Sequence, residues 1–389
     1  MSKDAKNVPA LRFKGYSDAW EKRKFKDLVV RVNKTSDDST IPSVEFEDII
    51  SKQGRLNKDV RLKINSKQGI YFEPQDVLFG KLRPYLQNWL FPSFYGRAVG
   101  DFWVLRANSS VLSEYLFVLI QSPRFQIVAN ISSGTKMPRS DWNTVSNTSF
   151  PIPVQSEQRK IWQLFNVLDN LIAATQHKID ALEQIKEKLS QNLFDQSWRF
   201  KEYSTPWKEN KLKDIVSAYS GGTPSANIRT YYGGHIPFIR SAEIHSSTTA
   251  LTLTQEGLQN SSAKLVKTGD ILYALYGANS GDVDRSKING AINQAILAMR
   301  PSKENDPNFI LFQLMRMKDK IVSTYLQGGQ GNLSGRLILA LNLDMPESTL
   351  EQRTIGRLLQ LLCELIGVNQ SKYSQLELLK KSLLQNLFV

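Results

Sequence analysis

The hydrophobic residues of this chain follow two successive patterns, and both patterns occur twice. Short apolar runs broken by turn residues fill roughly the first 150 positions, and they predict strands. Nearly forty residues with apolar side chains three and four positions apart follow, and they predict one long helix. Helical spacing also appears inside each strand-rich part, at Tyr115–Val128 and Phe309–Val322. We therefore expect an α+β fold with two mixed, strand-rich domains and two long helices.

The second half of the chain also repeats the first in sequence. Arg12–Val29 returns as Arg199–Val216, which is 187 positions later. Asp76–Phe79 returns 194 positions later, and we expect this offset to hold without a gap to the C-terminus, where Gln191–Phe194 returns as Gln385–Phe388. The second copy therefore carries seven extra residues near its start. A duplicated unit predicts approximate two-fold character and a target with two parts.

The long helices are expected from about residue 156 to 194 and from about residue 349 to 388. Each carries an apolar three-four seam that is interrupted by polar residues at the same place, and such an interruption fixes register at a cost in stability. The seam positions are Ile161, Leu164, Leu168, Leu171, Thr175, Lys178, Leu182, Ile185, Leu189 and Asn192, and then Ile355, Leu358, Leu362, Leu365, Asn369, Lys372, Leu376, Leu379, Leu383 and Asn386. We expect the helices to pair as an antiparallel coiled coil. The alternative, each helix packed on its own domain, remains open.

These patterns divide the chain into four segments. We assign residues 1–154 to a first globular domain, 155–197 to a first helical spacer, 198–348 to a second globular domain and 349–389 to a second spacer. If the helices pair antiparallel, the domains lie at opposite ends of a rod of roughly 55–60 Å, because each helical residue adds 1.5 Å.

The composition is that of a globular protein, with 41% hydrophobic and 22% charged residues. The single cysteine, Cys363, excludes an internal disulfide and a zinc site built from cysteines, and its apolar surroundings indicate a buried thiol. Neither a secretion signal nor an apolar stretch long enough to cross a membrane is recognisable. We expect a cytoplasmic protein without a membrane partner.

The net charge of +13 points to a polyanionic partner. Residues 1–198 carry 28 basic and 21 acidic side chains, and residues 199–389 carry 22 and 16, so both copies are basic. The excess is concentrated in residues 51–100, with nine basic and three acidic groups. Nucleic acid bound by such surfaces releases counterions, which favours binding. A globular protein that merely has a high pI is the alternative.

Residues suited to catalysis are missing from the pattern. The three histidines, His177, His235 and His245, have no spacing typical of a metal site. No phosphate-binding loop of the form Gly-x-x-x-x-Gly-Lys-Ser/Thr and no Asn/Asp-Pro-Pro-Tyr/Phe motif of amino-methylating enzymes occurs. Asp282 and Asp284 are interpreted as turn residues rather than cation ligands. We expect no catalytic residue, metal or cofactor in this chain.

Side chains suited to reading DNA recur in loops at matched places of the two copies. Arginine and lysine can pair with guanine edges or phosphates, and asparagine and glutamine can make two hydrogen bonds to adenine. The candidates are Lys81, Arg83, Tyr85, Lys136 and Arg139 in the first copy, and Arg240, Tyr273, Tyr276, Asn279, Arg285, Lys287, Asn293, Gln294, Gln330, Asn332 and Arg336 in the second. Each of them alone is also compatible with ordinary solvated surface, and their recurrence favours binding.

Four motifs together resemble the specificity subunit of type I restriction-modification enzymes. They are Ser220–Ser225, Tyr232–Ser241, Gly269–Tyr273 and the Glu351–Ile355 segment that opens the second long helix. The resemblance extends over the whole chain. The first copy departs from it, because it lacks Gly-Gly-Thr-Pro-Ser and has Gln75 where the second copy has Gly269.

The resemblance implies a non-catalytic subunit in which each globular part is a target-recognition domain for one half of an interrupted DNA sequence. The helices would set the distance between the halves and dock two methyltransferase subunits. Those subunits would methylate adenine with S-adenosylmethionine. Restriction subunits, which need ATP and magnesium, would join this core for DNA cleavage in host defence. Because the two copies have diverged in their loops, we expect an asymmetric site.

Two other functions remain open. One is a basic coiled-coil scaffold that binds nucleic acid without sequence preference, and it predicts binding that depends strongly on salt and not on sequence. The other is a self-contained DNA enzyme, which predicts activity in the isolated chain.

Overall fold

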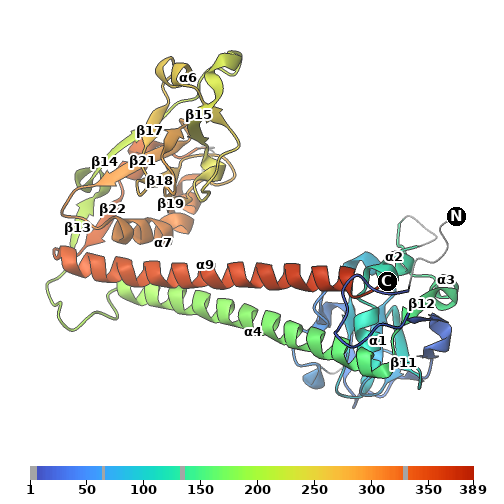
Figure 1. The fold of residues 1–389 in the computed structure, drawn as a ribbon. Coiled ribbons are helices and arrows are strands. Elements are labelled where there is room, and N and C mark those ends of the chain that lie inside the picture. The colour runs from blue at the N-terminus through green and yellow to red at the C-terminus, as the bar shows by residue number, and fades with distance from the viewer. Residues whose placement is uncertain (1–6, 64–65, 132–135, 327–331) are drawn as a thin grey trace. The chain divides into compact units, whose positions relative to one another are not determined.

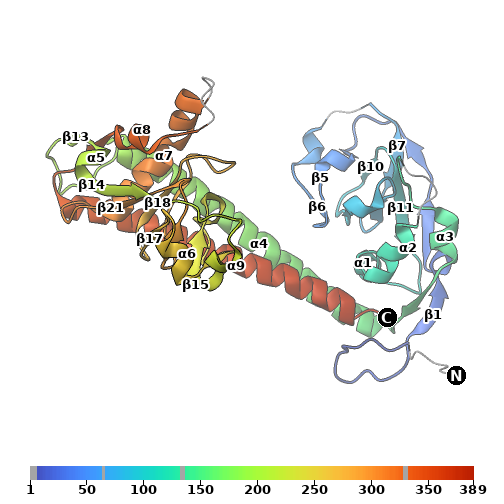
Figure 2. The same ribbon diagram turned by 90° about the horizontal axis from the view of Figure 1, so that it is seen from above.

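The computed structural model describes residues 7–63, 66–131, 136–326 and 332–389, and it divides into two compact units (Figures 1 and 2). Unit 1 consists of Met1–His177 and Asn369–Val389, and unit 2 of Lys178–Val368. The division crosses both long helices, α4 (Gln155–Phe194) and α9 (Thr349–Asn386). Each unit therefore contains one strand-rich domain and a segment of both helices.

Unit 1 contains three sheets and a two-stranded ribbon. The first sheet pairs β1 (Glu21–Lys24) with β12 (Ser149–Ile152), and the ribbon pairs β5 (Ile49–Ile50) with β6 (Arg55–Leu56). The second sheet has the order β2 (Val29–Val32), β11 (Phe102–Ala107), β8 (Val77–Gly80) and β9 (Trp89–Leu90), and the third has the order β3 (Thr35–Ser36), β7 (Gly69–Phe72), β10 (Gly96–Ala98) and β4 (Ser43–Val44). All pairs are antiparallel except β10 with β4.

The short helices of unit 1 differ from the single helix expected at Tyr115–Val128. The structure has α1 (Ser113–Leu119) and α2 (Pro123–Ala129), followed later by α3 (Trp142–Asn147). Proline favours the first position of a new helix, and the Ser122 hydroxyl accepts a hydrogen bond from Phe125 N there. The 3-10 turns are η1 (Phe25–Asp27), η2 (Phe46–Asp48), η3 (Val60–Leu62) and η4 (Pro84–Leu86).

Unit 2 repeats this architecture. Its first sheet pairs β13 (Lys208–Lys211) with β22 (Asn342–Met345). Its second sheet has the order β14 (Val216–Ser220), β21 (Ile296–Pro301), β18 (Ile271–Ala274) and β19 (Val283–Arg285). Its third sheet has the order β16 (Thr252–Leu253), β15 (Tyr232–Ile239), β20 (Gly290–Ile292) and β17 (Lys264–Val266). Its helices are α5 (Leu212–Ile215), α6 (Gln255–Gln259), α7 (Pro307–Leu326) and α8 (Gly335–Leu339), with 3-10 turns η5 (Arg229–Tyr231) and η6 (Ser241–Glu243). Helix α7 is continuous, because Met317 replaces the helix-starting Pro123.

The two units share their sheets strand by strand, except at one edge. The sheet β2-β11-β8-β9 corresponds to β14-β21-β18-β19, and β7-β10-β4 corresponds to β17-β20-β15, with one parallel pair in each. In unit 1 the extra edge strand β3 pairs with β7, whereas in unit 2 the extra edge strand β16 pairs with β15 on the opposite side. The repeated sheet therefore has its additional edge strand on opposite sides in the two units.

One stretch of the repeat is shifted by a residue from the predicted offset. The hydrogen bond from Phe25 N to Thr148 O corresponds to the bond from Leu212 N to Leu341 O, both 2.9 Å, and the two acceptors are 193 positions apart. The prediction of an unbroken offset of 194 is therefore wrong from α3 to the start of α4. Relative to unit 1, unit 2 is one residue shorter in the connection before α8 and one residue longer in the connection before α9. Both changes fall in connections, where changes in length cost little.

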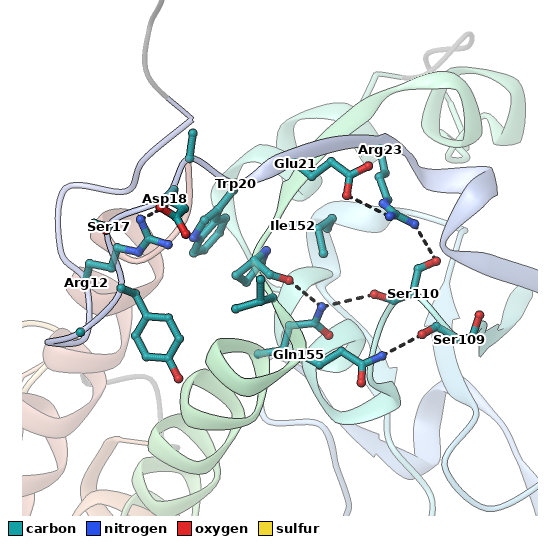
Figure 3. A pocket seen from close by; sticks show the side chains of 16 residues that line it. Arg12, Ser17, Asp18, Trp20, Glu21, Arg23, Ser109, Ser110, Ile152 and Gln155 are labelled. Carbon is teal, nitrogen blue, oxygen red and sulfur yellow. Dashed lines mark hydrogen bonds and ion pairs between the residues drawn. The ribbon is translucent and has the colours of Figure 1, made fainter.

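The polar segment that precedes the first strand of each repeat, which we call the lead, forms hydrogen bonds with the first turn of the long helix. In unit 1 Arg12 donates to both oxygens of Glu157, at 2.9 and 3.0 Å, and Trp20 Nε1 donates to the same carboxylate at 3.2 Å. Figure 3 shows the cavity of about 490 Å³ between this lead and the first turn of α4. Glu157 is almost completely buried, so its charge depends on these partners.

Unit 2 has the same anchor. Arg199 donates to Glu351 at 2.7 and 2.9 Å, and Trp207 Nε1 donates at 3.1 Å. The glutamine that follows each glutamate is also buried, and it accepts a hydrogen bond from a strand-rich part, from Leu112 N to Gln158 and from Asp306 N to Gln352. These contacts explain why Glu-Gln recurs at both helix starts.

The two long helices run antiparallel within each unit. In unit 1 the Phe165 and Phe388 rings lie 6.5 Å apart, and Lys380 forms a 2.8 Å ion pair with Asp169, so positions rise on α4 as they fall on α9. Figure 1 places the C-terminal end of α9 beside the start of α4. In unit 2, Leu193 shares a core cluster with Ile355 and Leu359. The antiparallel pairing predicted from the seam is present in both units.

Six of the twenty predicted seam positions are exposed, and the other fourteen are buried or half-buried. A register that lies one residue later at every second position is buried or half-buried throughout: Ile161, Phe165, Leu168, Ile172, Thr175, Ile179, Leu182, Lys186, Leu189 and Leu193, and then Ile355, Leu359, Leu362, Ile366, Asn369, Tyr373, Leu376, Lys380, Leu383 and Leu387. The predicted members Leu171, Ile185, Leu365 and Leu379 are instead 44, 53, 41 and 48% exposed. Because Leu164 and Leu171 each precede another large apolar residue, spacing alone does not distinguish the two registers.

The end of each long helix packs on the start of a repeat. Leu11 N donates to Asn386 O at 2.8 Å in unit 1, and Trp198 N donates to Asn192 O at 3.1 Å in unit 2. The two donors, Leu11 and Trp198, are 187 positions apart, and the two acceptors, Asn192 and Asn386, are 194 positions apart, which are the offsets of the repeat. The contact between Leu11 and Asn386 therefore reproduces the contact at the junction between the two copies.

Candidate nucleic-acid interface

Three separate segments of unit 1 meet at the end of strand β8. The loop 81–87 forms a bridge from Leu82 to Arg139, and Arg83 N donates to Pro138 O at 2.7 Å. Lys81 N donates to Asp101 O, and Ser140 N donates to Lys81 O, both at 2.8 Å. We call residues 81–87, 101 and 136–140 loop cluster 1. Backbone hydrogen bonds thus bring the two loops predicted for the first copy together.

Loop cluster 1 presents more positive than negative charge. Lys81 and Arg139 both face Asp101, at 3.5 and 3.0 Å. The side chains of Arg83 and Lys136 are exposed and form no hydrogen bond or ion pair with another described residue. Arg83 also has a left-handed backbone (φ 49°), which turns the chain into η4.

Tyr85 extends the same surface with an exposed aromatic ring. It lies in η4, which begins at Pro84. The proline ring restricts its own backbone and fills a buried place, so the exposed side chains on both sides of it start from a fixed point. Cations and one aromatic ring therefore form a compact polar surface.

Unit 2 builds the corresponding cluster on the same backbone hydrogen bonds. Leu275 N donates to Ala295 O at 2.8 Å, and Leu333 N donates to Leu275 O at 2.9 Å. We call residues 275–281, 293–295 and 332–333 loop cluster 2. It brings together the candidates Tyr276, Asn279, Asn293, Gln294 and Asn332, which come from three segments of the chain.

The side chains of loop cluster 2 are mainly neutral amides. Asn279 donates to Asp282 at 3.1 Å, Asn293 accepts from Ala295 N at 3.2 Å, and Gln294 accepts from the Thr223 hydroxyl at 2.5 Å. Burial raises the pKa of Tyr276, so its phenol remains a neutral donor and acceptor. The cluster is therefore polar and largely uncharged.

Two of the predicted residues in unit 2 do not face the binding surface. Tyr273 is fully buried in β18, where burial raises the pKa of its phenol well above the ordinary value. Both faces of this strand are covered, which the sequence pattern did not reveal. Arg285 lies opposite Ile271 at the far end of the β18–β19 pair, and it donates to Gly269 O at 3.0 Å and Asn308 at 2.9 Å.

Three further candidates lie outside loop cluster 2. Arg240 donates twice to Glu243 at 3.1 Å, and Lys287 donates to His245 O at 2.6 Å. Arg336 is exposed on α8, where it lines a cavity with Lys213. Gln330 lies outside the described residues.

The acidic pair Asp282 and Asp284 is occupied by protein side chains. Asp282 bonds Lys318 and Asn279, and these bonds outweigh the effect of burial, so that its pKa is lowered. Asp284 bonds His245 at 2.9 Å, and this hydrogen bond raises the pKa of the imidazole. In the part of the chain that the structure describes, no group of three or more His, Cys, Asp or Glu side chains is arranged to hold a metal ion.

The clusters differ in the chemistry they offer to DNA. A guanidinium such as Arg83 can donate two hydrogen bonds to guanine O6 and N7, or it can contact phosphate. The amides of Asn279, Asn293 and Gln294 can pair with adenine N6 and N7. Sequence reasoning did not select Asp101, which faces Lys81 and Arg139, or Thr223, which donates to Gln294. A lone acidic residue such as Asp101 has no distinguishing pattern, whereas Thr223 belongs to the motif Ser220–Ser225.

Comparison with protein families identifies both halves of the chain. Residues 17–184 and 204–378 each match the family model described as the type I restriction modification DNA specificity domain. Within the described residues, the structure contains no helix that combines the length and the apolar character needed to cross a bilayer.

Curated relatives are similar over different shares of the chain. The type I restriction enzyme MjaVIII specificity subunit of Methanocaldococcus jannaschii is 26% identical over 301 residues, which are 72% of this chain and 70% of that protein. The HindI specificity subunit of Haemophilus influenzae is 21% identical and matches 81% of this chain and 86% of its own. The MjaIX specificity subunit of Methanocaldococcus jannaschii is 27% identical, but its match spans only 34% of either chain.

Among solved structures, the S subunit of a type I restriction-modification system from M. genitalium is similar over nearly its whole length. The TM-score is 0.70 at 15% identity, and the match covers 98% of this chain and 99% of that chain. At this identity the likeness establishes a shared fold.

Proposed function

Because the chain belongs to the family of type I restriction-modification DNA specificity domains, we propose that it is a non-catalytic specificity subunit whose two units read different halves of an asymmetric, interrupted DNA site. The observation that carries this proposal is the pair of loop clusters. They share their backbone hydrogen bonds, and they present different side chains.

Each loop cluster reads one half-site through the edges of its bases. In unit 1 Arg83 and Tyr85 contact bases, while Lys136 contacts phosphate and positions the domain without reading sequence. In unit 2 the amides around Asn279 read bases. The net charge of +13 adds an affinity for DNA that does not depend on sequence and weakens with salt.

The paired helices α4 and α9 set the number of base pairs between the half-sites. A helix rises 1.5 Å per residue and DNA 3.4 Å per base pair, so adding or removing residues in both helices moves the permitted spacer. Inserting one heptad into the stretch Ala174–Ile185 and one into the matching stretch Val368–Leu379 tests this role. An unchanged spacer would contradict it.

The helices also provide matched docking surfaces for two methyltransferase subunits. Four large aliphatic residues of the helices are exposed in unit 1, namely Val167, Leu171, Leu378 and Leu379, and five in unit 2, namely Ile185, Leu350, Leu361, Leu365 and Val368. Three pairs of them are related by the repeat offset of 194. Exposed apolar groups of this kind favour a protein partner, and their duplication favours two copies of it.

The reactions of the complex belong to its other subunits. The methyltransferase subunits supply S-adenosylmethionine chemistry at an adenine of each half-site, and the restriction subunits supply ATP- and magnesium-dependent translocation and cleavage. This chain binds none of these cofactors for catalysis, and it directs both reactions to one DNA sequence.

Coexpression with the cognate methyltransferase subunit, followed by mapping of methylated adenines in the host genome, tests the proposal. The partner expressed alone is the control. Methylation at one interrupted, non-palindromic motif that requires this chain is the expected result. Methylation that is absent, or unchanged without this chain, would favour a scaffold that binds nucleic acid without sequence preference.

A further inference from the structure

Unit 2 contains a cavity that is distinct from loop cluster 2. It has a volume of about 540 Å³ and lies between α5, β21 and α8. Figure 2 shows α5 and α8 side by side above β21. Leu297, Leu339 and Ala340 supply an apolar lining, and the other lining side chains are Lys211, Lys213 and Arg336.

Unit 1 fills the equivalent place with its own tryptophan. The first residue of α3 is Trp142, and the first residue of α8 is Gly335, each following an N-cap side chain that accepts a hydrogen bond. Trp103 of β11 corresponds to Leu297 of β21. In unit 1 the two indole rings pack edge to face with centroids 5.1 Å apart. Replacement of both tryptophans by smaller residues leaves the space open in unit 2.

The filled cavity of unit 1 indicates what the open cavity accepts. Trp142 is a flat, two-ring group, and the Arg31 guanidinium lies 4.8 Å from its ring centroid. The residue corresponding to Arg31 is Ala218, which leaves the face of a bound ring uncovered in unit 2. A side-chain carbon added at Gly335 would come 3.3 Å from Leu297, so the glycine keeps the entrance clear.

The charges at the cavity specify an anionic ligand. The side chains of Lys211, Lys213 and Arg336 are exposed, and none of these side chains forms a hydrogen bond or ion pair with another described residue. Among the described residues, no carboxylate lines this cavity. Three cations beside an apolar slot suit a ligand that joins a flat ring to phosphate.

We propose that this cavity binds a purine nucleotide. The purine, a flat two-ring system like indole, lies on Leu297 between α5 and α8, where Trp142 lies in unit 1. The phosphates contact Lys211, Lys213 and Arg336. A free nucleotide and a nucleotide within a DNA strand share this chemistry. A tryptophan side chain of a partner would fill the slot without using the three cations, so it is the less favoured occupant.

Calorimetric titration of the full-length chain with ATP tests the proposal, and two substitutions copy unit 1 into unit 2. Gly335→Trp and Leu297→Trp each introduce the ring that unit 1 already accommodates, and both are expected to weaken ATP binding at least about tenfold by occupying the slot. Lys213→Gln is expected to weaken it about threefold to tenfold, because it removes one hydrogen bond to a charged group. Lys26→Gln, at the equivalent position of unit 1, is the matched control and should leave binding unchanged.

Partial ligands separate ring from charge. Adenosine and tripolyphosphate should each bind more weakly than ATP, and CTP should bind more weakly than ATP because its ring is smaller. Tripolyphosphate binding as tightly as ATP would overturn the proposal, and so would ATP binding in both tryptophan variants that is as tight as in the native chain. N-acetyltryptophanamide binding more tightly than ATP would also overturn it.

DNA oligonucleotides distinguish the two sources of the nucleotide. Single-stranded DNA with one adenine should bind better than the same strand with an abasic site if the nucleotide belongs to DNA, and Gly335→Trp should abolish the preference. ATP binding without this preference identifies a free nucleotide. Neither result would contradict the site. Sequence-directed methylation should survive Gly335→Trp, so this test is independent of the function proposed above.

Discussion

The two loop clusters have the same backbone connections and different chemistry. Lys81 and Leu275 occupy equivalent places, and each exchanges backbone hydrogen bonds with the same two neighbouring segments. The positions of Arg83, Tyr85 and Arg139 in unit 1 correspond to Gly277, Asn279 and Asn332 in unit 2. Hydrogen bonds between backbone atoms therefore fix the frame of the loop clusters, while the side chains on that frame differ.

The conserved part of the comparison lies away from the clusters. In both units an aspartate that precedes the central strand forms a two-point ion pair with an arginine of the neighbouring strand, Asp76 with Arg106 and Asp270 with Arg300, at distances of 2.7 to 2.8 Å. The anchors of the long helices are duplicated as well. Buried charge pairs therefore maintain the frame on which the loops differ.

The largest expected effect concerns that frame. Glu157→Ala should lower the free energy of unfolding by about 3–5 kcal/mol, because it leaves Arg12 without its charge partner in a largely buried place. Glu351→Ala should have a similar effect through Arg199. Chemical denaturation measures both values. A loss below about 1 kcal/mol in one variant alone would mean that the anchors are not equivalent.

The next largest effect concerns the two binding surfaces. Arg83→Ala should weaken discrimination in one half-site by about 1–3 kcal/mol, since a two-point contact to a base is lost. Asn279→Ala is the matched change in loop cluster 2, and it should affect the other half-site. Competition binding with DNA duplexes mutated in either half measures both. Equal effects of either variant on the two halves would argue against separate readers.

A smaller effect is expected where the helix pairs differ. Asp169 and Lys380 form an ion pair in unit 1, whereas the corresponding residues of unit 2 are Cys363 and Lys186. Burial raises the pKa of the Cys363 thiol, which favours its neutral form. Cys363→Asp should give unit 2 its own ion pair and raise the free energy of unfolding by about 0.5–1 kcal/mol. Chemical denaturation at low and high salt measures this gain in stability. Cys363→Asn is the uncharged control. An equal gain in Cys363→Asn would exclude the ion pair as the cause of the gain.

The smallest effect is a pH dependence confined to unit 2. The hydrogen bond to Asp284 raises the pKa of His245 in the folded chain, so this contribution to stability is complete below about pH 6.5, the unfolded value, and is lost as pH rises through the raised folded value. NMR titration should give a higher midpoint for His245 in the native chain than in Asp284→Asn. Identical midpoints would show that the carboxylate has no influence.

The sequence was sufficient for the architecture because hydrophobic spacing and repetition are properties of the whole chain. The α+β fold, the two strand-rich domains and the long helices are confirmed. The seam prediction included six exposed positions of twenty, such as Leu171, because Leu171 and Ile172 are both apolar and only packing decides which one faces the partner helix. The helix expected at Tyr115–Val128 was divided by a proline whose preference for a helix start outweighed the spacing.

The candidate site was less predictable, because the clusters depend on contacts between distant segments. The sequence indicated the loops at 81–87 and 275–281, but it gave no reason to place Asp101 between Lys81 and Arg139. Tyr273 was chosen for its chemistry, although its strand is covered on both faces. The cavity beside Gly335 depends on how α5, β21 and α8 pack together, and no spacing in the sequence indicates that packing.

The most direct test of separate readers is methylation mapping with a chain in which residues 12–198 occur twice in succession. The junction is already present in the native chain, because Leu11 and Trp198 make equivalent hydrogen bonds to the helix ends. Coexpressed with the methyltransferase subunit, this chain should direct methylation to an inverted repeat in which both halves equal one half of the native site. Methylation that stays at the native asymmetric motif would contradict the assignment of one half-site to each unit.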